Sequence, residues 1–207
     1  SLAKKLNGDA PGYLASAAKS IGATLAHYST DYVFDGEPEI SEPAGCAYVC
    51  RDCTLHDSFN PLPQIGFDEE AKLKPINNYG KSKLAGEKEV KKHGKKYYII
   101  RLSKLFGKPG ISEGAKRSFF DVMLELGKNN KEVKVVDEET SCFTYAPDLA
   151  KKTKEIIESE KPYGIYHVAN SDPCTWYEAV LELYRQAKIK AKVIPVGSEE
   201  FLRPAKR

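Results

Sequence analysis

The chain has 207 residues, of which 41% are hydrophobic and 29% are charged, so it can bury a sizeable core in one compact domain or slightly more. Lysine and arginine total 32 against 29 aspartate and glutamate, and this net charge of +3 gives no electrostatic reason to expect nucleic acid or an anionic membrane as a partner. No apolar run approaches the roughly 20 residues of a membrane span, and no signal-peptide pattern follows Ser1. With five cysteines and no secretion signal, we expect a soluble protein of the reducing cytoplasm.

Helix-like and strand-like segments alternate from one end of the chain to the other. Apolar periodicity and capping residues predict the helices, and short β-branched or aromatic runs predict the strands. In chain order we predict a helix over 2–20, a strand over 24–28, an irregular stretch over 35–75, a helix over 78–92, a strand over 97–102, a helix over 118–126, a strand over 133–136, a helix over 146–158, a strand over 165–169, a helix over 175–187 and a strand over 193–196. This alternation favours an α/β fold with a Rossmann-like parallel sheet and flanking helices.

Tyr79 and Lys83 are one helical turn apart in the charged helix predicted over 78–92, so both side chains project from one face. A phenol with a pKa near 10 exchanges protons poorly at neutral pH, and a neighbouring ammonium favours the phenolate and lowers that pKa. Such a tyrosine can protonate a carbonyl oxygen while a hydride reaches the carbonyl carbon. Thr30, at the end of the strand upstream, is placed to hydrogen-bond the same oxygen, because ligands of open α/β sheets lie beyond the carboxyl ends of the strands.

Spacing alone is weak support, because a lysine-rich chain with 12 tyrosines produces such pairs by chance. A second pair, Tyr184 and Lys188, lies on a helix with an apolar stripe, and we expect that tyrosine to belong to the core. The flanking sequence separates the two pairs. Around Tyr79, a proline-led turn and the small residues Gly80 and Ser82 leave room for a ligand at the start of the helix.

Two segments carry a resemblance to a known family: Ser-Thr-Asp-Tyr-Val-Phe-Asp-Gly at 29–36 and Asn-Tyr-Gly-Lys-Ser-Lys-Leu-Ala-Gly-Glu at 78–87. Together they resemble the dTDP-4-dehydrorhamnose reductases, which are extended short-chain dehydrogenases that use NADPH. Further similarity covers most of the chain, at 100–103, 105–107, 144–150 and 164–169. Two matches of this length in the right order are very unlikely to arise by chance.

The resemblance implies roles for individual residues. Thr30, Tyr79 and Lys83 would be catalytic: Thr30 would polarise the carbonyl, Tyr79 would be the general acid, and Lys83 would tune Tyr79 and hold the nicotinamide ribose. Tyr79 and Lys83 would therefore also bind the cofactor, which would be NADPH, with NADH as the alternative. Asp31 and Tyr32 would lie at the substrate, with a packing role left open for Tyr32.

Asn7, in the first predicted helix, matches an asparagine that supports the active site in this superfamily, and a plain surface asparagine is the alternative. The partners implied by the resemblance are a sugar nucleotide as substrate and a second copy of the chain in a homodimer, with neither nucleic acid nor a membrane.

Members of this family begin with a strand, a glycine-rich turn and a helix that hold the cofactor pyrophosphate, and Ser1 corresponds to a point beyond them. We therefore expect the N-terminal cofactor-binding part to be missing from this chain, and a fragment with little activity alone. Residues 1–107 would form a partial Rossmann-type domain with the catalytic motifs and a cysteine-containing insert over about 37–75. Residues 108–207 would form mainly the substrate-binding part, interleaved with the sheet.

One segment imitates a dinucleotide-binding turn. Gly107, Gly110 and Gly114 follow an apolar strand, but their spacing departs from G-x-G-x-x-G and Pro109 occupies the turn. We therefore do not expect a cofactor site there.

The insert contains four soft metal ligands within eleven positions: Cys46, Cys50, Cys53 and His56. Zinc is one interpretation, since Cys-x-x-Cys is a common ligand spacing. A single tight run is weaker than two separated pairs, so ordinary loop thiols are the favoured interpretation and we predict no metal site.

The chain departs from the family where the substrate binds. Lys104 replaces a tryptophan that commonly packs on the substrate, and it could meet a phosphate or carboxylate of another sugar nucleotide or be solvated. We expect NADPH-dependent reduction of the 4-keto group of a deoxy-sugar nucleotide. Two alternatives remain open: a non-catalytic nucleotide-binding subunit similar to the regulatory subunit of methionine adenosyltransferase, and a sugar-nucleotide epimerase or dehydratase.

Overall fold

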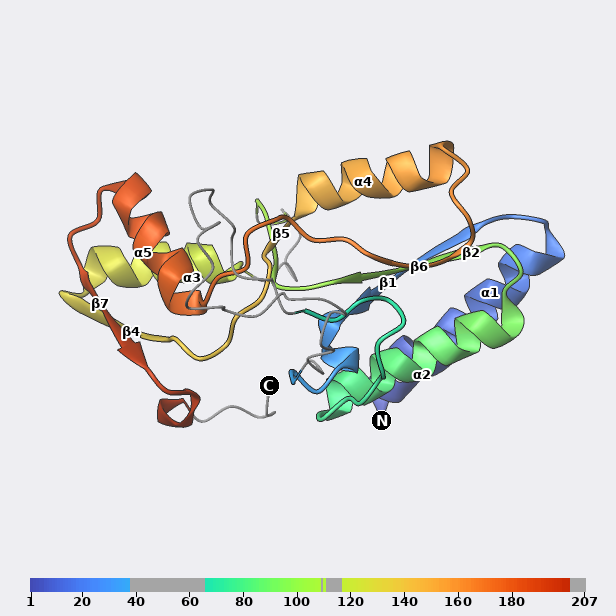
Figure 1. The fold of residues 1–207 in the computed structure, drawn as a ribbon, viewed down its shortest axis with the longest axis horizontal. Helices are drawn as coiled ribbons and strands as arrows, with labels where there is room; N and C mark the ends of the chain where they lie inside the picture. Colours follow the sequence, from blue (N-terminus) through green and yellow to red (C-terminus); the bar gives the residue numbers. More distant parts are fainter. Residues whose placement is uncertain (38–65, 109, 111–116, 202–207) are drawn as a thin grey trace, which may run out of the picture.

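The computed structural model describes residues 1–37, 66–108, 110 and 117–201 (Figure 1). In chain order its elements are η1 (Lys4–Asp9), α1 (Ala10–Ser20), β1 (Leu25–Thr30), η2 (Asp31–Val33), α2 (Asn78–His93), β2 (Tyr97–Leu102), β3 (Leu105–Phe106), α3 (Phe119–Asn129), β4 (Glu132–Val136), β5 (Thr144–Tyr145), α4 (Ala146–Glu158), β6 (Gly164–His167), α5 (Trp176–Ala187), β7 (Lys192–Val196) and η3 (Ser198–Glu200). Every predicted helix and strand has a counterpart, and α4 has the predicted bounds.

The central sheet has three parallel strands in the order β1–β2–β6. Two short parallel pairs, β3–β5 and β4–β7, lie outside it. The α/β class with parallel strands is therefore confirmed. We expected one sheet, whereas the strands of the described residues form three separate sheets. The chain leaves the central sheet at Lys104, whose φ of 39° is a left-handed backbone conformation that turns β3 away from β2.

The side chains of β2 alternate between the two faces of the sheet, as a strand buried on both sides requires. Ile99 packs with Ala15 of α1 and Val90 of α2. Ile100 packs on the other side with residues of α4, among them Leu149. Figure 1 shows the same layers, with α1 and α2 side by side below the sheet and α4 above it. The carboxyl ends of β1, β2 and β6 meet at one edge, and this edge positions the candidate site.

Helix α2 begins where its capping residue dictates. The side chain of Asn77 accepts a hydrogen bond from the Gly80 amide at 2.8 Å, which satisfies one of the free amides of the first turn. The helix ends at Gly94, whose amide donates to the Val90 carbonyl. A Cβ atom at Gly94 would lie 2.7 Å from that carbonyl oxygen, so this position favours glycine.

The second pair of strands, β4–β7, packs against α3 and α5, and we call these four elements the small unit. In Figure 1 the small unit lies at the end of the molecule away from α1. Its core contains Trp176 and Tyr184, and the Tyr184 hydroxyl donates to the Met123 carbonyl at 2.8 Å. Tyr184 is only 3% exposed, which confirms the predicted core role.

One face of η1 and α1 exposes large apolar side chains. They are Leu2, Leu6, Tyr13, Leu14 and Ile21, each 59% to 79% exposed, and we call them the apolar stripe. In the part of the chain that the structure describes, the outer edge of β1 also has no strand partner. None of the helices in these described residues has the length and apolar character needed to cross a membrane.

Candidate active site

Helix α2 meets the end of β1 through a close backbone approach. A Cβ atom on Gly80 would collide with the Tyr32 carbonyl, so a residue with a side chain here would push the helix away. This approach brings the rings of Tyr32 and Tyr79 to a centroid distance of 5.6 Å at 81°. Thr30 and Tyr79, which the sequence analysis selected from separate motifs, are therefore neighbours in space.

The Thr30 hydroxyl lies at the centre of this arrangement. It donates to Asp31 Oδ1 at 3.0 Å, accepts from the Tyr32 amide at 3.3 Å, and is hydrogen-bonded to the Tyr79 hydroxyl. A hydroxyl has one proton to donate. While that proton points at Asp31, Thr30 must rotate before it can donate to another oxygen, and it lowers the Tyr79 pKa by donating to the ionised phenolate.

The pKa of Tyr79 is raised above its usual value, and the predicted lowering by Lys83 is wrong for this arrangement. Burial is the main cause, the hydrogen bond with Thr30 opposes it, and the Asp31 carboxylate adds to it. Lys83 instead donates to the Tyr28 carbonyl at 2.5 Å. Burial lowers the pKa of Lys83, and Glu87, one turn further along α2, partly opposes that shift.

Asn7 supports the start of α2 from the neighbouring helix. Its side-chain amide donates to Ser82 Oγ at 3.1 Å, and Ser82 Oγ donates to the Tyr79 carbonyl at 2.7 Å. Asn7 lies in η1, a π-helical turn of the kind often found near functional sites. The packing is tight here as well, because a Cβ atom on Gly86 would collide with the Asn7 carbonyl.

Behind the site, Glu87 of α2 and Arg101 of β2 form a buried ion pair that the sequence analysis missed. Two guanidinium nitrogens donate to the two carboxylate oxygens at 3.0 and 2.8 Å. Ser29, the residue before Thr30, donates to Glu87 Oε1 at 2.5 Å. The signal in the sequence was a charged residue, Arg101, inside an apolar strand, because such residues are rarely buried without a partner.

The same arginine reaches the segment that leads into α2. Arg101 Nη1 donates to the Glu69 carbonyl at 3.2 Å and lies 3.4 Å from His167 Nε2. His167 Nδ1 lies 3.1 Å from the Phe67 carbonyl, and the backbone amide of His167 donates to the Glu69 carboxylate at 2.8 Å. Burial, together with the nearby guanidinium, lowers the pKa of His167, although Glu69 opposes the shift. The neutral ring fits these contacts, with Nδ1 as the donor and Nε2 as the acceptor.

His27 lies on β1, on the face that carries Ser29. Its Nε2 atom is buried without a hydrogen-bond partner among the described residues. Burial, aided by the Lys83 ammonium, lowers the pKa of His27 to about 4. The ring is therefore neutral at physiological pH.

Lys104 lies at the junction between the sheet and the small unit. Its ammonium donates to the Glu139 carbonyl at 2.9 Å and the Cys174 carbonyl at 3.4 Å. It also lies 4.3 Å from the centroid of the Trp176 ring and 4.9 Å from that of Phe143. Lys104 is thus turned towards the chain's own carbonyls and aromatic rings.

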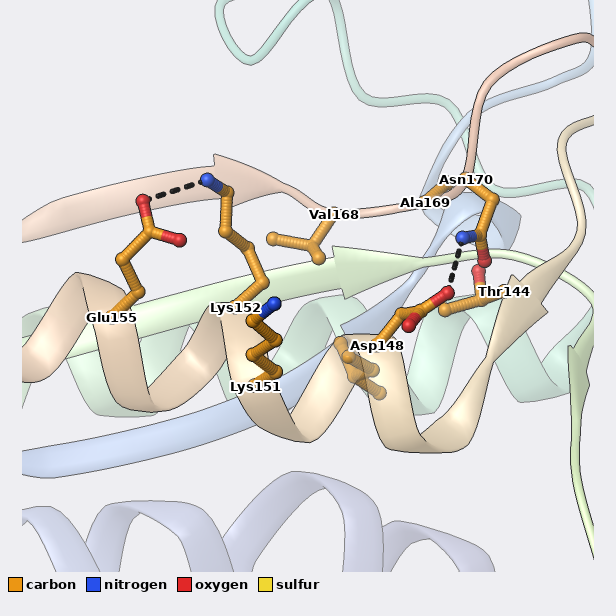
Figure 2. A pocket seen from close by; sticks show the side chains of 9 residues that line it. Thr144, Asp148, Lys151, Lys152, Glu155, Val168, Ala169 and Asn170 are labelled. Carbon is orange, nitrogen blue, oxygen red and sulfur yellow. Dashed lines mark hydrogen bonds and ion pairs between the residues drawn. The ribbon is translucent and has the colours of Figure 1, made fainter.

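Two neighbouring hollows lie on the α4 side of the sheet, with volumes of about 270 and 380 Å³. Figure 2 shows the first, between α4 and the chain that follows β6. Asp148 and Asn170 line both hollows, and they bond each other at 2.7 Å. Neither Thr30 nor Tyr79 lines them, so the hollows are separate from the candidate catalytic residues.

The residues of the cysteine insert, Cys46, Cys50, Cys53 and His56, lie outside the described residues. Gly107 belongs to the segment that resembles a dinucleotide-binding turn. It lies against Ala146, and a Cβ atom added to Gly107 would be 3.1 Å from the Cβ of Ala146. Within the described part of the chain, no cluster of three or more histidine, cysteine or acidic side chains is suited to a metal ion.

Comparison with known proteins agrees with this geometry. A family model described as the RmlD substrate binding domain matches residues 1–207. The spore coat polysaccharide biosynthesis protein SpsK of Bacillus subtilis is 31% identical over 196 residues, which are 95% of this chain and 58% of that protein. The dTDP-4-dehydrorhamnose reductase of Mycobacterium tuberculosis is 30% identical over 207 residues, which are 100% of this chain and 60% of that enzyme.

Solved structures give the same result. A dTDP-4-dehydrorhamnose reductase of Clostridium acetobutylicum is 36% identical with a TM-score of 0.80, covering 100% of this chain and 62% of that one. The enzyme of Bacillus anthracis, solved in complex with NADP, is 35% identical with a TM-score of 0.78, covering 97% of this chain and 60% of that one. The chain thus spans about three fifths of the length of these relatives. It belongs to the RmlD substrate binding domain family, among the dTDP-4-dehydrorhamnose reductases and their relatives.

Proposed function

We propose that this chain supplies the proton-donating and substrate-binding part of an NADPH-dependent reductase that acts on the 4-keto group of a deoxy-sugar nucleotide. The observation that carries the proposal is that Tyr79 meets Thr30 at the carboxyl end of β1, where the Tyr79 ring lies 5.6 Å from that of Tyr32, with Lys83 one turn further along α2. The relatives named dTDP-4-dehydrorhamnose reductase support the substrate class, and the Bacillus anthracis structure with NADP supports the cofactor. NADH is the alternative donor.

In this proposal Tyr79 is the general acid. A phenol is protonated at neutral pH, and the raised pKa of Tyr79 favours this state further, which is the state that reduction of a ketone requires. The phenol gives its proton to the C4 oxygen as negative charge develops there. The Thr30 hydroxyl can then rotate from Asp31 towards the new phenolate or the substrate oxygen and stabilise the charge.

NADPH, when bound, would supply the hydride, and the residues present suit its ribose. Lys83 is partly buried beside the strand ends, and only one of the three N–H groups of its ammonium is needed for the Tyr28 carbonyl. The remaining N–H groups and the half-exposed Tyr79 hydroxyl can bind the ribose hydroxyls. A new positive charge near Tyr79 would also oppose the rise in its pKa.

We further propose that Asp31 and Tyr32 contact the sugar and that Lys104 contributes to the substrate-binding part. Asp31 and Tyr32 flank the catalytic pair through the Thr30 hydroxyl and the Tyr79 ring. We divide the chain into a partial Rossmann-type domain over 1–107 and a mainly substrate-binding part over 108–207. Support for the interleaving comes from β6, which lies in the second part of the chain but pairs with β2 of the first.

We place this protein in the cytoplasm, because its proposed substrate is a dissolved sugar nucleotide. The apolar stripe supplies a surface through which two copies could form a homodimer. Neither statement requires nucleic acid or a membrane as a partner.

The test is NADPH oxidation by the intact protein that contains this chain, with dTDP-4-dehydrorhamnose and related 4-keto sugars. We expect turnover that falls at least about 100-fold in Tyr79→Phe, since general acids typically contribute 100- to 10,000-fold. Tyr163→Phe is the matched control, because Tyr163 is a half-exposed tyrosine at 49% directly before β6, at the end of the sheet opposite the candidate site. Cofactor binding without oxidation of NADPH would favour the regulatory subunit, and turnover without net oxidation would favour the epimerase or dehydratase.

A further inference from the structure

We propose that Lys104 is a positioning residue that latches the small unit to the end of the central sheet. Its backbone belongs to the turn between β2 and β3, whereas its ammonium reaches Glu139, which follows β4, and Cys174, which precedes α5. The latch goes beyond the proposed function, because it concerns how the two parts of the chain are held together.

Among the described residues, two carbonyl oxygens and two aromatic rings form a cation-binding cage around the ammonium. The Glu139 carbonyl and the Cys174 carbonyl accept two of its protons, at 2.9 and 3.4 Å. The rings of Trp176 and Phe143 present their faces at 4.3 and 4.9 Å, inside the roughly 6 Å over which an ammonium is attracted to an aromatic face. An uncharged side chain of the same length would remove both hydrogen bonds to the carbonyls and both cation–π contacts with the rings.

The cage joins segments that are far apart in the sequence. The backbones of Ser141 and Cys174 form an antiparallel bridge with both N–H···O distances at 3.2 Å. Trp176, at the start of α5, donates from its indole nitrogen to the Glu139 carboxylate at 2.9 Å. Lys104 is thus bonded to Cys174, one partner of this bridge, and to Glu139, which lies two residues before the other partner.

The backbone conformation of Lys104 sets the direction of its side chain. Its φ of 39° lies in the left-handed region, which is less favourable for lysine than for glycine. The left-handed backbone is explained if it aims the side chain into the cage.

The test uses the chain's single tryptophan, Trp176, which lies in the cage and is 8% exposed. In Lys104→Met we expect acrylamide to quench Trp176 fluorescence more strongly. We also expect the amides of Ser141 and Cys174 to exchange hydrogen about tenfold faster, the size expected when a cation–π contact of roughly 1–2 kcal/mol is lost. Lys190→Met, a change of an exposed lysine in the small unit, should alter neither signal.

Two further variants separate the latch from a general loss of stability. If backbone strain alone mattered, Lys104→Gly would slow exchange at Ser141 and Cys174, whereas the latch predicts faster exchange. In Lys104→Ala, propylammonium should restore protection, because it replaces the missing part of the side chain with its charge. Propanol, which has the same shape without the charge, should not. Unchanged quenching and exchange in Lys104→Met, or equal rescue by propanol, would overturn the latch.

One consequence rests on the proposed function. Because the cage holds the segment around Glu139 and Phe143, loss of the latch should weaken dTDP binding by the intact protein about tenfold, which corresponds to roughly 1.4 kcal/mol. If the unaltered protein fails to bind dTDP, the proposed substrate class is wrong, and the exchange data still judge the latch by themselves.

Discussion

Glu87 and Arg101 form a bidentate ion pair, with 2.8 Å between Glu87 Oε2 and Arg101 Nη2. The pair is buried, since Glu87 is 1% exposed and Arg101 is 2% exposed. The pair links α2 to β2 directly behind the candidate catalytic residues, and Ser29 adds β1 to the same carboxylate. Buried charges of this kind are stable only when each has its partner. The positions of Thr30 and Lys83 therefore depend on two residues that do not touch the substrate side of the site.

Removal of one partner should be far more damaging than removal of both. We expect Arg101→Met or Glu87→Gln to lower the free energy of unfolding by roughly 3–5 kcal/mol, because a buried charge or polar group loses its partner. The double variant with Met at both positions should recover much of that loss. Urea unfolding measures all three. Lys152→Met, which breaks the exposed pair with Glu155, is the control and should cost less than about 1 kcal/mol. Equal costs for the buried and exposed pairs would contradict the prediction.

Acid should destabilise the chain through His27. Burial lowers its pKa from 6.5 to about 4, so the unfolded state binds a proton more readily than the folded state between these values. The stability from the neutral ring is complete above pH 6.5 and is lost as the pH falls towards 4. After allowance for partial exposure, we expect a loss of about 2–3 kcal/mol over this range. His167 has a lowered pKa as well and should act in the same direction.

The measurement is urea unfolding between pH 7 and pH 4. His27→Gln should flatten the pH dependence, because it removes the titrating ring. A pH dependence that is the same in the unaltered protein and in His27→Gln would show that His27 does not control acid stability.

The pKa of Tyr79 should respond in opposite directions to its two neighbours. Asp31→Asn removes a negative charge that raises this pKa, so the pKa should fall. Thr30→Val removes a hydrogen bond that lowers it, so the pKa should rise. Ultraviolet titration of each variant, with and without Tyr79→Phe, isolates this one tyrosine among 12. Asp172→Asn, an exposed aspartate distant in sequence, is the control. Movement in the same direction for both variants would refute this account of the site.

The apolar stripe should make the 207-residue chain associate with itself. Large apolar side chains exposed along one helical face favour association in water. We expect light scattering to show dimers or larger species at micromolar concentrations. Leu6→Lys combined with Leu14→Lys should shift the chain towards the monomer, because both residues lie on the stripe with about 60% exposure. Leu181→Lys, at 42% exposure on α5, should not. A monomeric chain at all concentrations would remove the stripe as a docking surface.

The sequence predicted the features that depend on neighbouring residues. Asn77 and Gly94 delimit α2 through local hydrogen bonds, and α4 starts behind Tyr145 with a proline in its first turn, so both helices could be read directly. The proximity of Thr30 and Tyr79 could be predicted for two reasons. Each residue lies in a specific motif, and ligands of parallel sheets lie beyond the carboxyl ends of the strands, where Thr30 is found. These parts of the site needed no knowledge of distant contacts.

The remaining features depend on contacts between distant segments. Glu87 finds Arg101 only once α2 has packed on the sheet, and Lys104 finds Trp176 only when α5 reaches the junction. The direction of the shift in the Tyr79 pKa failed for the same reason. It is set by burial and by Asp31, whereas the sequence showed only a lysine one turn away.

The pairing of β4 with β7 also dictates an order of folding. Lys134 of β4 is aligned with Ile194 of β7, and between them the chain returns to the sheet to form α4 and β6. During synthesis β4 therefore leaves the ribosome well before its partner and must wait with its valines exposed. The small unit closes last, around a sheet that is already built, and a delay in completing residues 192–196 leaves an aggregation-prone strand edge in the nascent chain.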